Sequence, residues 1–267
     1  MKTQVLIIGK KSFVGSAIYN FIKNKIKAKL ISYDDIKNTK INKYTHIINA
    51  SINKKYFLNK YNKFNDLDLK IAKKIMYTDI KYIFFSTRKV YKKKFNIFEY
   101  DNLDPRCNYS RNKLKTEKEL LKMLGSNVLI LRISNILGLK KDKKNKRIVH
   151  SLFLDNFFRY QISDSKFFFL NEFKDFITIN QFNRVVYLLI KNNLTGIFNV
   201  SLGKRIYLSE IIKWLKKLNT NIFIKKKLNI KNSFTLSNRK LLSKIKVKLL
   251  KKEVKDFCIN LYKKINF

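Results

Sequence analysis

The fold of this chain is decided by the stretch Val5-Leu-Ile-Ile-Gly9-Lys-Lys-Ser12-Phe-Val-Gly15. The apolar run at its start indicates a buried strand, and the apolar side chains that follow Phe13 recur at helical spacing. A turn with small residues between a strand and a helix lets backbone N–H groups approach a phosphate, and the helix N-terminus adds partial positive charge. Ser12 stands where a further glycine is usual, so these residues are also compatible with an ordinary tight turn.

Outward from this stretch, short apolar runs alternate with amphipathic stretches over the first 140 residues, which is the pattern of βαβ units. The strands are continuously apolar, and strands buried on both faces belong to parallel sheets. We therefore predict an α/β fold, a Rossmann-type doubly wound parallel sheet with a smaller C-terminal lobe. The predicted strands cover residues 5–8, 28–33, 44–50, 82–86 and 128–133, and the predicted helices cover 13–25, 67–76 and 108–123.

The pattern changes beyond about residue 140, where Lys140–Arg147 is predicted to form an exposed basic loop. Further helices are predicted at 181–191, 208–218 and 254–264, with short strands at 167–170 and 197–200. Neither a linker nor an internal repeat separates the two halves. We predict a dinucleotide-binding domain over residues 1–140, whose core elements continue beyond 140, and a substrate lobe over 141–267 packed on it.

The formal net charge is +42, and nine of the 60 basic residues are arginines. Lys, Asn, Ile, Phe and Tyr are all enriched together, and their codons are rich in A and T. The lysines are spread along the whole chain, and no aromatic-basic RNA-binding signature is present. We interpret the charge as compositional bias and expect no dedicated nucleic-acid surface. The field would still attract a small molecule that carries phosphate.

Several features point to a cytoplasmic protein without metal. No run of 18 uncharged apolar residues is present, so we predict no membrane insertion, and the N-terminal apolar run is too short for a signal peptide. Cys107 and Cys258 are far apart and form no metal or redox motif, which is typical of free thiols in a reducing compartment. His46 and His150 are also far apart, so no metal site is predicted.

Polar residues follow the predicted second strand, where a bound dinucleotide would place its adenosine ribose. Asp34 could accept a hydrogen bond from the ribose 2′-OH, which would favour NAD. Lys10 and Lys11 have the opposite effect, because cations near this position can meet the 2′-phosphate of NADP. The choice between the two cofactors therefore stays open, as does the simpler interpretation of Asp34 as the start of a loop.

Two further segments carry groups suited to acid–base chemistry. Tyr109 and Lys113 are four residues apart on a predicted helix and so share one face. A neighbouring cation stabilises a phenolate and lowers its pKa towards neutral pH. Ser86 and Thr87 end a predicted central strand, where hydroxyls face the ligand crevice of a parallel sheet. Tyrosine and lysine are so frequent here that the pair by itself is equally compatible with a surface contact.

Taken together and in order, these segments resemble the extended short-chain dehydrogenases/reductases, often called the NAD-dependent epimerase/dehydratase family. The resemblance covers nearly the whole chain, and Tyr109 follows Thr87 by 22 residues, a spacing that the family uses. Other segments that resemble the family's motifs are the strand Ile47–Ser51, the "LRxxNxxG" segment Leu131–Gly138, the "RDFI" segment Lys174–Ile177, the late strand Gly196–Val200 and the helix start Leu208–Ile211.

The resemblance implies a role for each matching residue. Tyr109 would be the general acid/base, Lys113 would hold the nicotinamide ribose and lower the pKa of Tyr109, and Thr87 would bind the reacting oxygen. The residues implied for binding NAD or NADP are Gly9, Ser12, Phe13, Val14, Gly15, Asp34, Asn49, Ala50, Ser51 and Lys113. The residues implied for binding the substrate are Ser86, Asn135 and Lys174.

The function implied is an NAD(P)-dependent oxidoreductase or epimerase acting on a nucleoside-diphosphate sugar, with a homodimer as an expected assembly. Arg88 and Lys89 stand where the dehydratases of the family carry an acidic pair, so dehydration is set aside. The short substrate lobe favours a 4-keto-sugar reductase, with an epimerase as the alternative. A non-catalytic Rossmann scaffold that binds a dinucleotide or RNA is the alternative of a different class. Lys174 replaces the arginine that is frequent in the "RDFI" segment and lacks its forked geometry.

Overall fold

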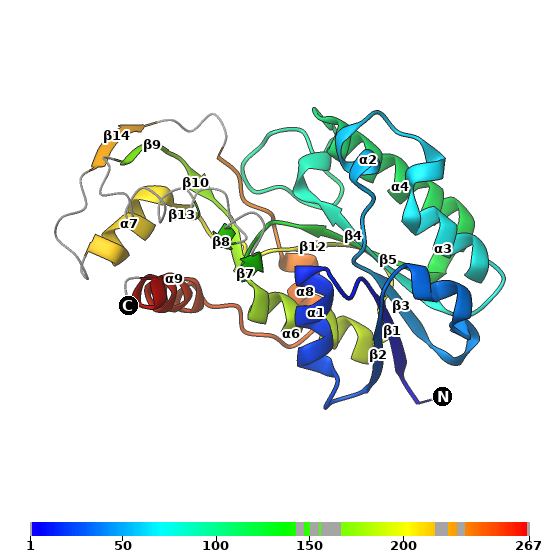
Figure 1. Cartoon of the computed structure of the whole chain (residues 1–267). Coiled ribbons are helices and arrows are strands. Elements are labelled where there is room, and N and C mark those ends of the chain that lie inside the picture. Colours follow the sequence, from blue (N-terminus) through cyan, green and yellow to red (C-terminus); the bar gives the residue numbers. More distant parts are fainter. Residues whose placement is uncertain are drawn as a thin grey trace.

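The computed structural model of the chain describes residues 2–142, 147–149, 155, 167–216, 224–228 and 233–265. At its centre lies a six-stranded sheet in the order β12-β5-β4-β3-β1-β2 (Figure 1). All of its neighbouring strands are parallel. The strands of this sheet are β1 (Gln4–Ile8), β2 (Lys27–Ile31), β3 (His46–Asn49), β4 (Lys81–Thr87), β5 (Val128–Ile133) and β12 (Gly196–Val200).

Helices cover both faces of this sheet, which confirms the predicted doubly wound fold. α1 (Phe13–Ile22) and α6 (Ile179–Lys191) pack together on one face, and α3 (Leu67–Ile75) and α4 (Asn108–Leu124) pack together on the other. The strand β1 shows why its run is continuously apolar. Val5 and Ile7 join the core under α1 and α6, whereas Leu6 and Ile8 join the core under α3 and α4.

The predicted core elements are confirmed with small shifts at their ends. β5 covers the predicted residues, and α4 extends one residue further, to Leu124. β4 runs from Lys81 to Thr87, one residue beyond the prediction at each end. α1 stops at Ile22, three residues early, because Lys25 and Ile26 turn back to donate their N–H groups to the Ile22 carbonyl. The short α2 (Lys54–Leu58), which packs against α4, was not predicted.

The remaining strands form two-stranded pairs outside the main sheet. β6 (Asn135–Leu137) pairs with β11 (Phe176–Thr178), β10 (Phe173–Lys174) with β13 (Ile206–Tyr207), and β9 (Phe167–Asn171) with β14 (Ile224–Leu228). The other helices are α7 (Leu208–Lys216), α8 (Arg239–Lys244), α9 (Lys251–Ile265) and the 3-10 turns η1 (Asp34–Asn38), η2 (Ile41–Lys43), η3 (Lys63–Asn65), η4 (Arg88–Val90) and η5 (Gly125–Asn127). Figure 1 shows α7, β9 and β14 together at one side, away from the main sheet.

The prediction of a basic loop over Lys140–Arg147 is wrong where the structure describes it. β7 (Leu139–Asp142) and β8 (Arg147–Val149) form an antiparallel pair that overlaps both ends of this stretch. Strand pairing is made by backbone groups, so a run of charged residues can form a ladder that hydrophobic patterning does not reveal.

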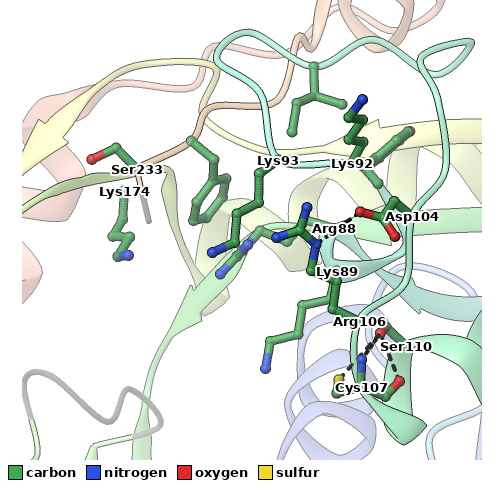
Figure 2. A pocket seen from close by; sticks show the side chains of 13 residues that line it. Arg88, Lys89, Lys92, Lys93, Asp104, Arg106, Cys107, Ser110, Lys174 and Ser233 are labelled. Atoms are coloured by element: carbon green, nitrogen blue, oxygen red, sulfur yellow. Dashed lines mark hydrogen bonds and ion pairs between the residues drawn. The ribbon is translucent and has the colours of Figure 1, made fainter. Parts of the chain in front are cut away.

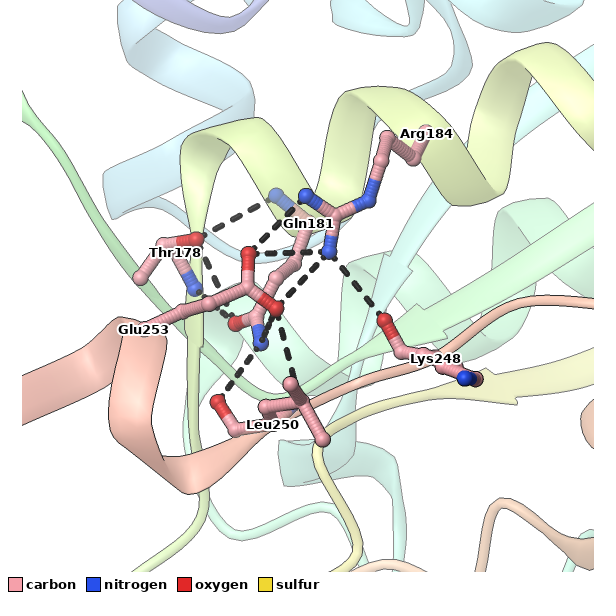
Figure 3. Close-up of polar contacts among 6 residues, drawn as sticks. All are labelled: Thr178, Gln181, Arg184, Lys248, Leu250 and Glu253. Atoms are coloured by element: carbon pink, nitrogen blue, oxygen red, sulfur yellow. Dashed lines mark hydrogen bonds and ion pairs between the residues drawn. The ribbon is translucent and has the colours of Figure 1, made fainter.

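A polar cluster fastens α6 to the start of α9 (Figure 3). Thr178 and Gln181 form a capping box, in which the Thr178 N–H donates to Gln181 Oε1 at 3.0 Å and the Gln181 N–H donates to Thr178 Oγ1 at 3.2 Å. Gln181 also donates to the Leu250 carbonyl at 3.0 Å, and Arg184 donates to the Glu253 carboxylate from both terminal nitrogens at 2.9 Å. These bonds hold the C-terminal helix against the helix that supports the main sheet.

None of the helices in the described part of the chain combines the length and the apolar composition needed to cross a bilayer.

Candidate functional site

The order of the strands reverses at β1, which has β2 on one side and β3 on the other. In open parallel sheets, ligands bind outside the carboxyl ends of the strands at such a reversal. The turn that leaves β1 carries Gly9, and the turn that leaves β3 carries Ala50 and Ser51. The fold thus brings these two segments of the predicted site to one edge of the sheet.

The two glycines of the first turn are required by close backbone packing. Gly9 has a φ of 124°, and a Cβ placed on it would lie 3.0 Å from the carbonyl carbon of Ala50. A Cβ on Gly15 would lie 2.8 Å from the carbonyl oxygen of Gly9 and 3.1 Å from Ala50 Cβ. The turn therefore leaves no room for side chains at these two positions, which fits a backbone cradle for a pyrophosphate at the N-terminus of α1.

Ser12 takes the place of a glycine without backbone strain. Its φ of −80° and ψ of 131° are extended values that any residue adopts. Its hydroxyl accepts the Gly15 N–H at 3.3 Å, and its own N–H donates to the Gly9 carbonyl at 2.8 Å. Ser12 is therefore the N-cap of α1, and its departure from the glycine pattern preserves the shape of the turn.

The side chains of Phe13 and Val14 pack on protein. A Cβ on Gly138 would lie 2.1 Å from Phe13 Cζ, so that glycine makes the space that the ring occupies. Val14 packs against the core under α1. Any contact of these two residues with a phosphate would come from their backbone N–H groups in the first turn of the helix.

The residues expected to decide between NAD and NADP, which are Asp34, Lys10 and Lys11, lie near the end of β2. The Gly9 and Lys10 N–H groups donate to the Ile31 carbonyl at 2.8 and 3.0 Å, which holds the first turn beside this strand end. Asp34 begins η1, and its side chain is exposed, as are those of Lys10 and Lys11. The three residues stand near one another in the fold, and each is accessible to a ligand.

Asn49, predicted to bind the cofactor, turns its side chain to protein groups in this structure. Asn49 Nδ2 donates to the Asp68 carboxylate at 2.8 Å, and Asn49 Oδ1 accepts the Ser51 N–H at 2.9 Å. The buried Asp68 also accepts the Tyr82 hydroxyl at 2.7 Å. The Asn49 side chain therefore fixes the backbone at the end of β3 through buried hydrogen bonds. Asp68 was missed because a lone acidic residue on a predicted helix carries no signal of its own.

Thr87, Tyr109 and Lys113 come from elements that pack on each other. α4 lies against β4 and against η4, the turn that follows Thr87. Thr87 is buried, and its hydroxyl accepts the Lys89 N–H at 3.3 Å. Tyr109, in the first turn of α4, packs its ring 4.9 Å from that of Phe57. The fold therefore places the two helical residues beside the strand end that carries the hydroxyl.

The ammonium group of Lys113 is buried, and it forms no ion pair or hydrogen bond with the residues that the structure describes. It lies 4.3 Å from the centroid of the Phe84 ring and 5.7 Å from that of Tyr56. Burial lowers the pKa of Lys113, and the nearby carboxylate of Asp68 opposes this effect. A buried cation held by aromatic faces retains donors for a ligand's oxygens.

The pKa of Tyr109 differs from the expectation. Burial raises it to about 12, and the Cys107 thiol and the Asp68 carboxylate add to the rise. Lys113 is not among the groups that shift this pKa, and its ammonium lies over the rings of Phe84 and Tyr56. The phenol is therefore protonated at neutral pH and suited to donate a proton.

The Ser86 side chain, predicted to contact the substrate, is engaged by protein in this structure. Its hydroxyl donates to the Glu117 carboxylate, which also forms a buried ion pair with Arg132 at 2.7 Å. Neighbouring residues of a strand face opposite sides, so Thr87 points away from this pair. The Glu117–Arg132 pair joins α4 to β5 and was missed, because spacing along the chain does not show which charges meet.

The segments around Asn135 and Lys174 are joined through Asp175. Asn135 donates from both its backbone and its side chain to the Asp175 carbonyl, at 3.2 and 3.1 Å. The Asp175 carboxylate is fully buried and accepts the N–H groups of Leu202 and Leu236 at 3.0 and 3.1 Å. The acid of this segment therefore fixes two loops.

The Lys174 side chain, in contrast to that of its neighbour Asp175, forms an ion pair, which joins its ammonium to the Glu172 carboxylate at 2.5 Å. It also lines a cavity of about 350 Å³ next to the strand end of Thr87 (Figure 2). Arg88 and Lys89, which follow Thr87, lie on one wall, and Cys107 and Ser110, which flank Tyr109, lie on another. The cavity therefore lies next to Thr87, Tyr109 and Lys113, although these three residues do not line it themselves. The remaining lining residues are Tyr91, Lys92, Lys93, Ile97, Asp104, Arg106, Ser233 and Phe234.

Among the described residues, no cluster of three or more His, Cys, Asp or Glu side chains is arranged to hold a metal ion. His46 lies buried in β3, where Thr45 Oγ1 is 2.9 Å from its Nδ1.

No family model matches the chain. No curated protein matches it either. Solved structures, in contrast, match over nearly the whole chain, at identities that establish similarity of fold.

The UDP-N-acetylglucosamine 4-epimerase of Methanobrevibacter ruminantium, solved with UDP-N-acetylmuramic acid, is 19% identical with a TM-score of 0.76 and covers 98% of both chains. The UDP-glucuronic acid 4-epimerase of Bacillus cereus, solved with NAD, is 14% identical with a TM-score of 0.73 and covers 99% of both. RMD from Pseudomonas aeruginosa, solved with NADPH, is 15% identical with a TM-score of 0.75 and covers 98% of this chain and 99% of that one. The chain thus has the fold of the extended short-chain dehydrogenases/reductases.

Proposed function

We propose that this chain is an NAD(P)-dependent enzyme that acts on a nucleotide-activated sugar by transferring a hydride to or from a ring carbon. The observation that carries the proposal is the placement of the helix with Tyr109 and Lys113 against the strand end with Thr87, beside a glycine turn that leaves no room for side chains. The solved structures with this fold support it, because they include epimerases of UDP-sugars and proteins bound to NAD or NADPH.

The turn at Gly9 and Gly15 would hold the pyrophosphate, and the free donors of Lys113 would bind the ribose next to the nicotinamide. When bound, the nicotinamide accepts or supplies the hydride. The Thr87 hydroxyl would donate a hydrogen bond to the reacting oxygen of the sugar. Tyr109 would give its proton to that oxygen when a carbonyl is reduced, and its pKa of about 12 keeps this proton on the phenol at neutral pH.

In the direction of oxidation, Tyr109 must accept the proton of the sugar hydroxyl. A phenol with a pKa of about 12 is a poor acceptor at neutral pH until a cation stabilises its anion. The Lys113 ammonium is one helical turn away and is not fixed by an ion pair, so it is the group we expect to supply this charge.

Epimerisation is the favoured form of the reaction. The short C-terminal part of the chain first favoured a 4-keto-sugar reductase, but two 4-epimerases match it over at least 98% of their own length. Chain length therefore does not separate the two activities. An epimerase oxidises and re-reduces its substrate with no net use of cofactor, whereas a reductase consumes one NAD(P)H per product.

The first experiment is a fluorescence titration with NADH and with NADPH in moderate salt, which suppresses nonspecific binding of anions. We expect saturable binding of one of them. Absence of binding of either would refute the proposed function and favour the non-catalytic scaffold.

The assay that follows is turnover of nucleotide sugars by the wild type and by Tyr109→Phe. We expect Tyr109→Phe to lower kcat by about 10²- to 10⁴-fold with unchanged cofactor affinity, because it removes the proton and keeps the ring. Tyr100→Phe is the matched control, since Tyr100 is 82% exposed and distant from the cavity lining. Undiminished turnover in Tyr109→Phe would refute the role of this residue.

Measuring NAD(P)H consumption against product formation separates the two forms of the reaction. Interconversion of two sugar epimers at constant NAD(P)H absorbance supports the epimerase. Stoichiometric loss of absorbance with a 4-keto sugar supports the reductase.

A further inference from the structure

The guanidinium group of Arg88 is a half-buried charge that lines the cavity next to Thr87. In the part of the chain that the structure describes, no carboxylate lies within ion-pair distance of it. Burial lowers its pKa to about 10, and the carboxylates of Asp175 and Glu172 act on it only from a distance. A buried charge of this kind is costly unless an anion meets it.

An aromatic ring holds Arg88 in a fixed orientation. The guanidinium carbon lies 3.5 Å from the centroid of the Phe234 ring, which is stacking distance. The segment that carries Phe234 is itself tied down, because Ser233 Oγ accepts the Phe173 N–H at 3.1 Å and Asp175 accepts the Leu236 N–H at 3.1 Å. A stacked guanidinium keeps its N–H donors in its own plane, where they match the two oxygens of a carboxylate.

The other charges of the cavity wall reinforce the positive field. Figure 2 shows Lys89, Lys92, Lys93 and Lys174 around the cavity with Arg88. Asp104 is the one carboxylate of the described lining, and it is paired with the rim residue Arg106 at 2.9 Å. Lys174 is paired with Glu172, so Arg88, Lys89 and Lys92 are the cations that would attract an anion and raise its local concentration.

We propose that this cavity binds a carboxylate carried by the sugar itself and that Arg88 selects nucleotide-activated uronic acids over neutral sugars. The inference rests on the proposed function, in which Thr87 binds the reacting oxygen of the sugar ring. Arg88 lines the cavity that adjoins the strand end of Thr87, so an anionic group bound by Arg88 would lie to one side of a ring whose reacting oxygen is held by Thr87. When the reaction occurs at C4, the carboxylate carbon C6 is attached to the adjacent C5. The nucleoside diphosphate is attached to C1, on the opposite side of the ring.

The test compares UDP-glucuronic acid with UDP-glucose, which differ only at C6. Binding to the protein saturated with its cofactor is measured by calorimetry, and kcat/KM is measured for each sugar. We expect the wild type to prefer the acid. We expect Arg88→Gln to lower kcat/KM for the acid by about 10- to 100-fold and to leave UDP-glucose within about twofold, as loss of a charge-assisted hydrogen-bond pair implies.

Two further variants sharpen the comparison. Arg88→Lys keeps the charge and loses the planar fork, so its preference should lie between those of the wild type and Arg88→Gln. Arg106→Gln is the matched control, because it removes an exposed arginine of the same rim that is already paired with Asp104, and it should keep the wild-type preference. Unchanged affinity for the cofactor in each variant shows that the fold is intact.

The outcomes separate this inference from the proposed function. Equal turnover of both sugars by the wild type would overturn the inference alone. Equal weakening of both sugars by Arg88→Gln would also overturn it, because Arg88 would then bind the diphosphate common to both. A wild type that binds neither cofactor nor either sugar would overturn the proposed function and the inference with it.

Discussion

At the scale of single residues, the fold changes the chemistry of groups whose sequence context is unremarkable. His46 sits in β3 with 4% of its surface exposed, and its Nε2 is buried with no hydrogen-bond partner among the described residues. Burial and the charge of Lys81 lower its pKa from 6.5 to about 4. A protonated imidazole would be a buried charge at this position, so the folded chain favours the neutral ring.

This shift predicts a dependence of stability on pH. Because the folded-state pKa lies below the unfolded one, the stabilisation is present above about pH 6.5 and is lost as pH falls towards 4. Between pH 7 and 5 the free energy of unfolding should fall by about 2 kcal/mol from this group. Urea denaturation at several pH values measures it, and His46→Gln should remove this part of the slope. Equal slopes in the two proteins would show that His46 is accessible to protons in the folded state.

At the scale of elements, helix starts position the site as strongly as the strands do. Ser12 caps α1 at the first turn, and Thr178 caps α6, the helix that packs beside α1. The capping box of α6 is linked through Gln181 to Leu250, so it fixes the entry of α9 as well. Loss of the α6 cap should therefore destabilise the packing of three helices, α1, α6 and α9.

Replacing Thr178 tests this coupling. Thr178→Ala removes the acceptor of the Gln181 N–H and should lower the free energy of unfolding by about 1–2 kcal/mol, measured by urea denaturation. Thr178→Ser keeps the hydroxyl and is the matched control, with most of the stability retained. A Thr178→Ala protein as stable as the wild type would mean that Gln181 and Glu253 hold the helix junction without the cap.

At the scale of the whole molecule, the net charge of +42 is what remains after all 18 acidic residues are set against the 60 basic ones, so ion pairs within the chain leave it uncompensated. Like charges repel more strongly in the compact state than in the extended chain, so this charge should destabilise the fold at low ionic strength. The cavity beside Thr87 is one place where the surplus is concentrated.

The thermal unfolding midpoint should therefore rise with salt. Going from about 0.01 M to 0.15 M shortens the screening length from about 30 Å to about 8 Å, which weakens repulsion between distant lysines. We expect an increase of several degrees with both NaCl and KCl, because the effect is screening and not binding of one ion. A midpoint that falls with salt would show that attractive pairs dominate.

The sequence by itself determined the alternation of strands and helices, because the apolar periodicity of Val5–Ile8 and of the later core elements records which faces are buried. It also located the segments of the site, since glycine at positions 9 and 15 and hydroxyls at a strand end are local requirements of backbone geometry. Only the tertiary structure decided which way each polar side chain turns.

Asn49 and Ser86 turn inward to Asp68 and Glu117, Lys113 lies over Phe84, and Arg88 stacks on Phe234, a residue 146 positions further along the chain. Hydrogen bonds and charges act at distances of a few ångströms between residues remote in sequence. Their partners are therefore set by packing, which patterns along the chain do not record.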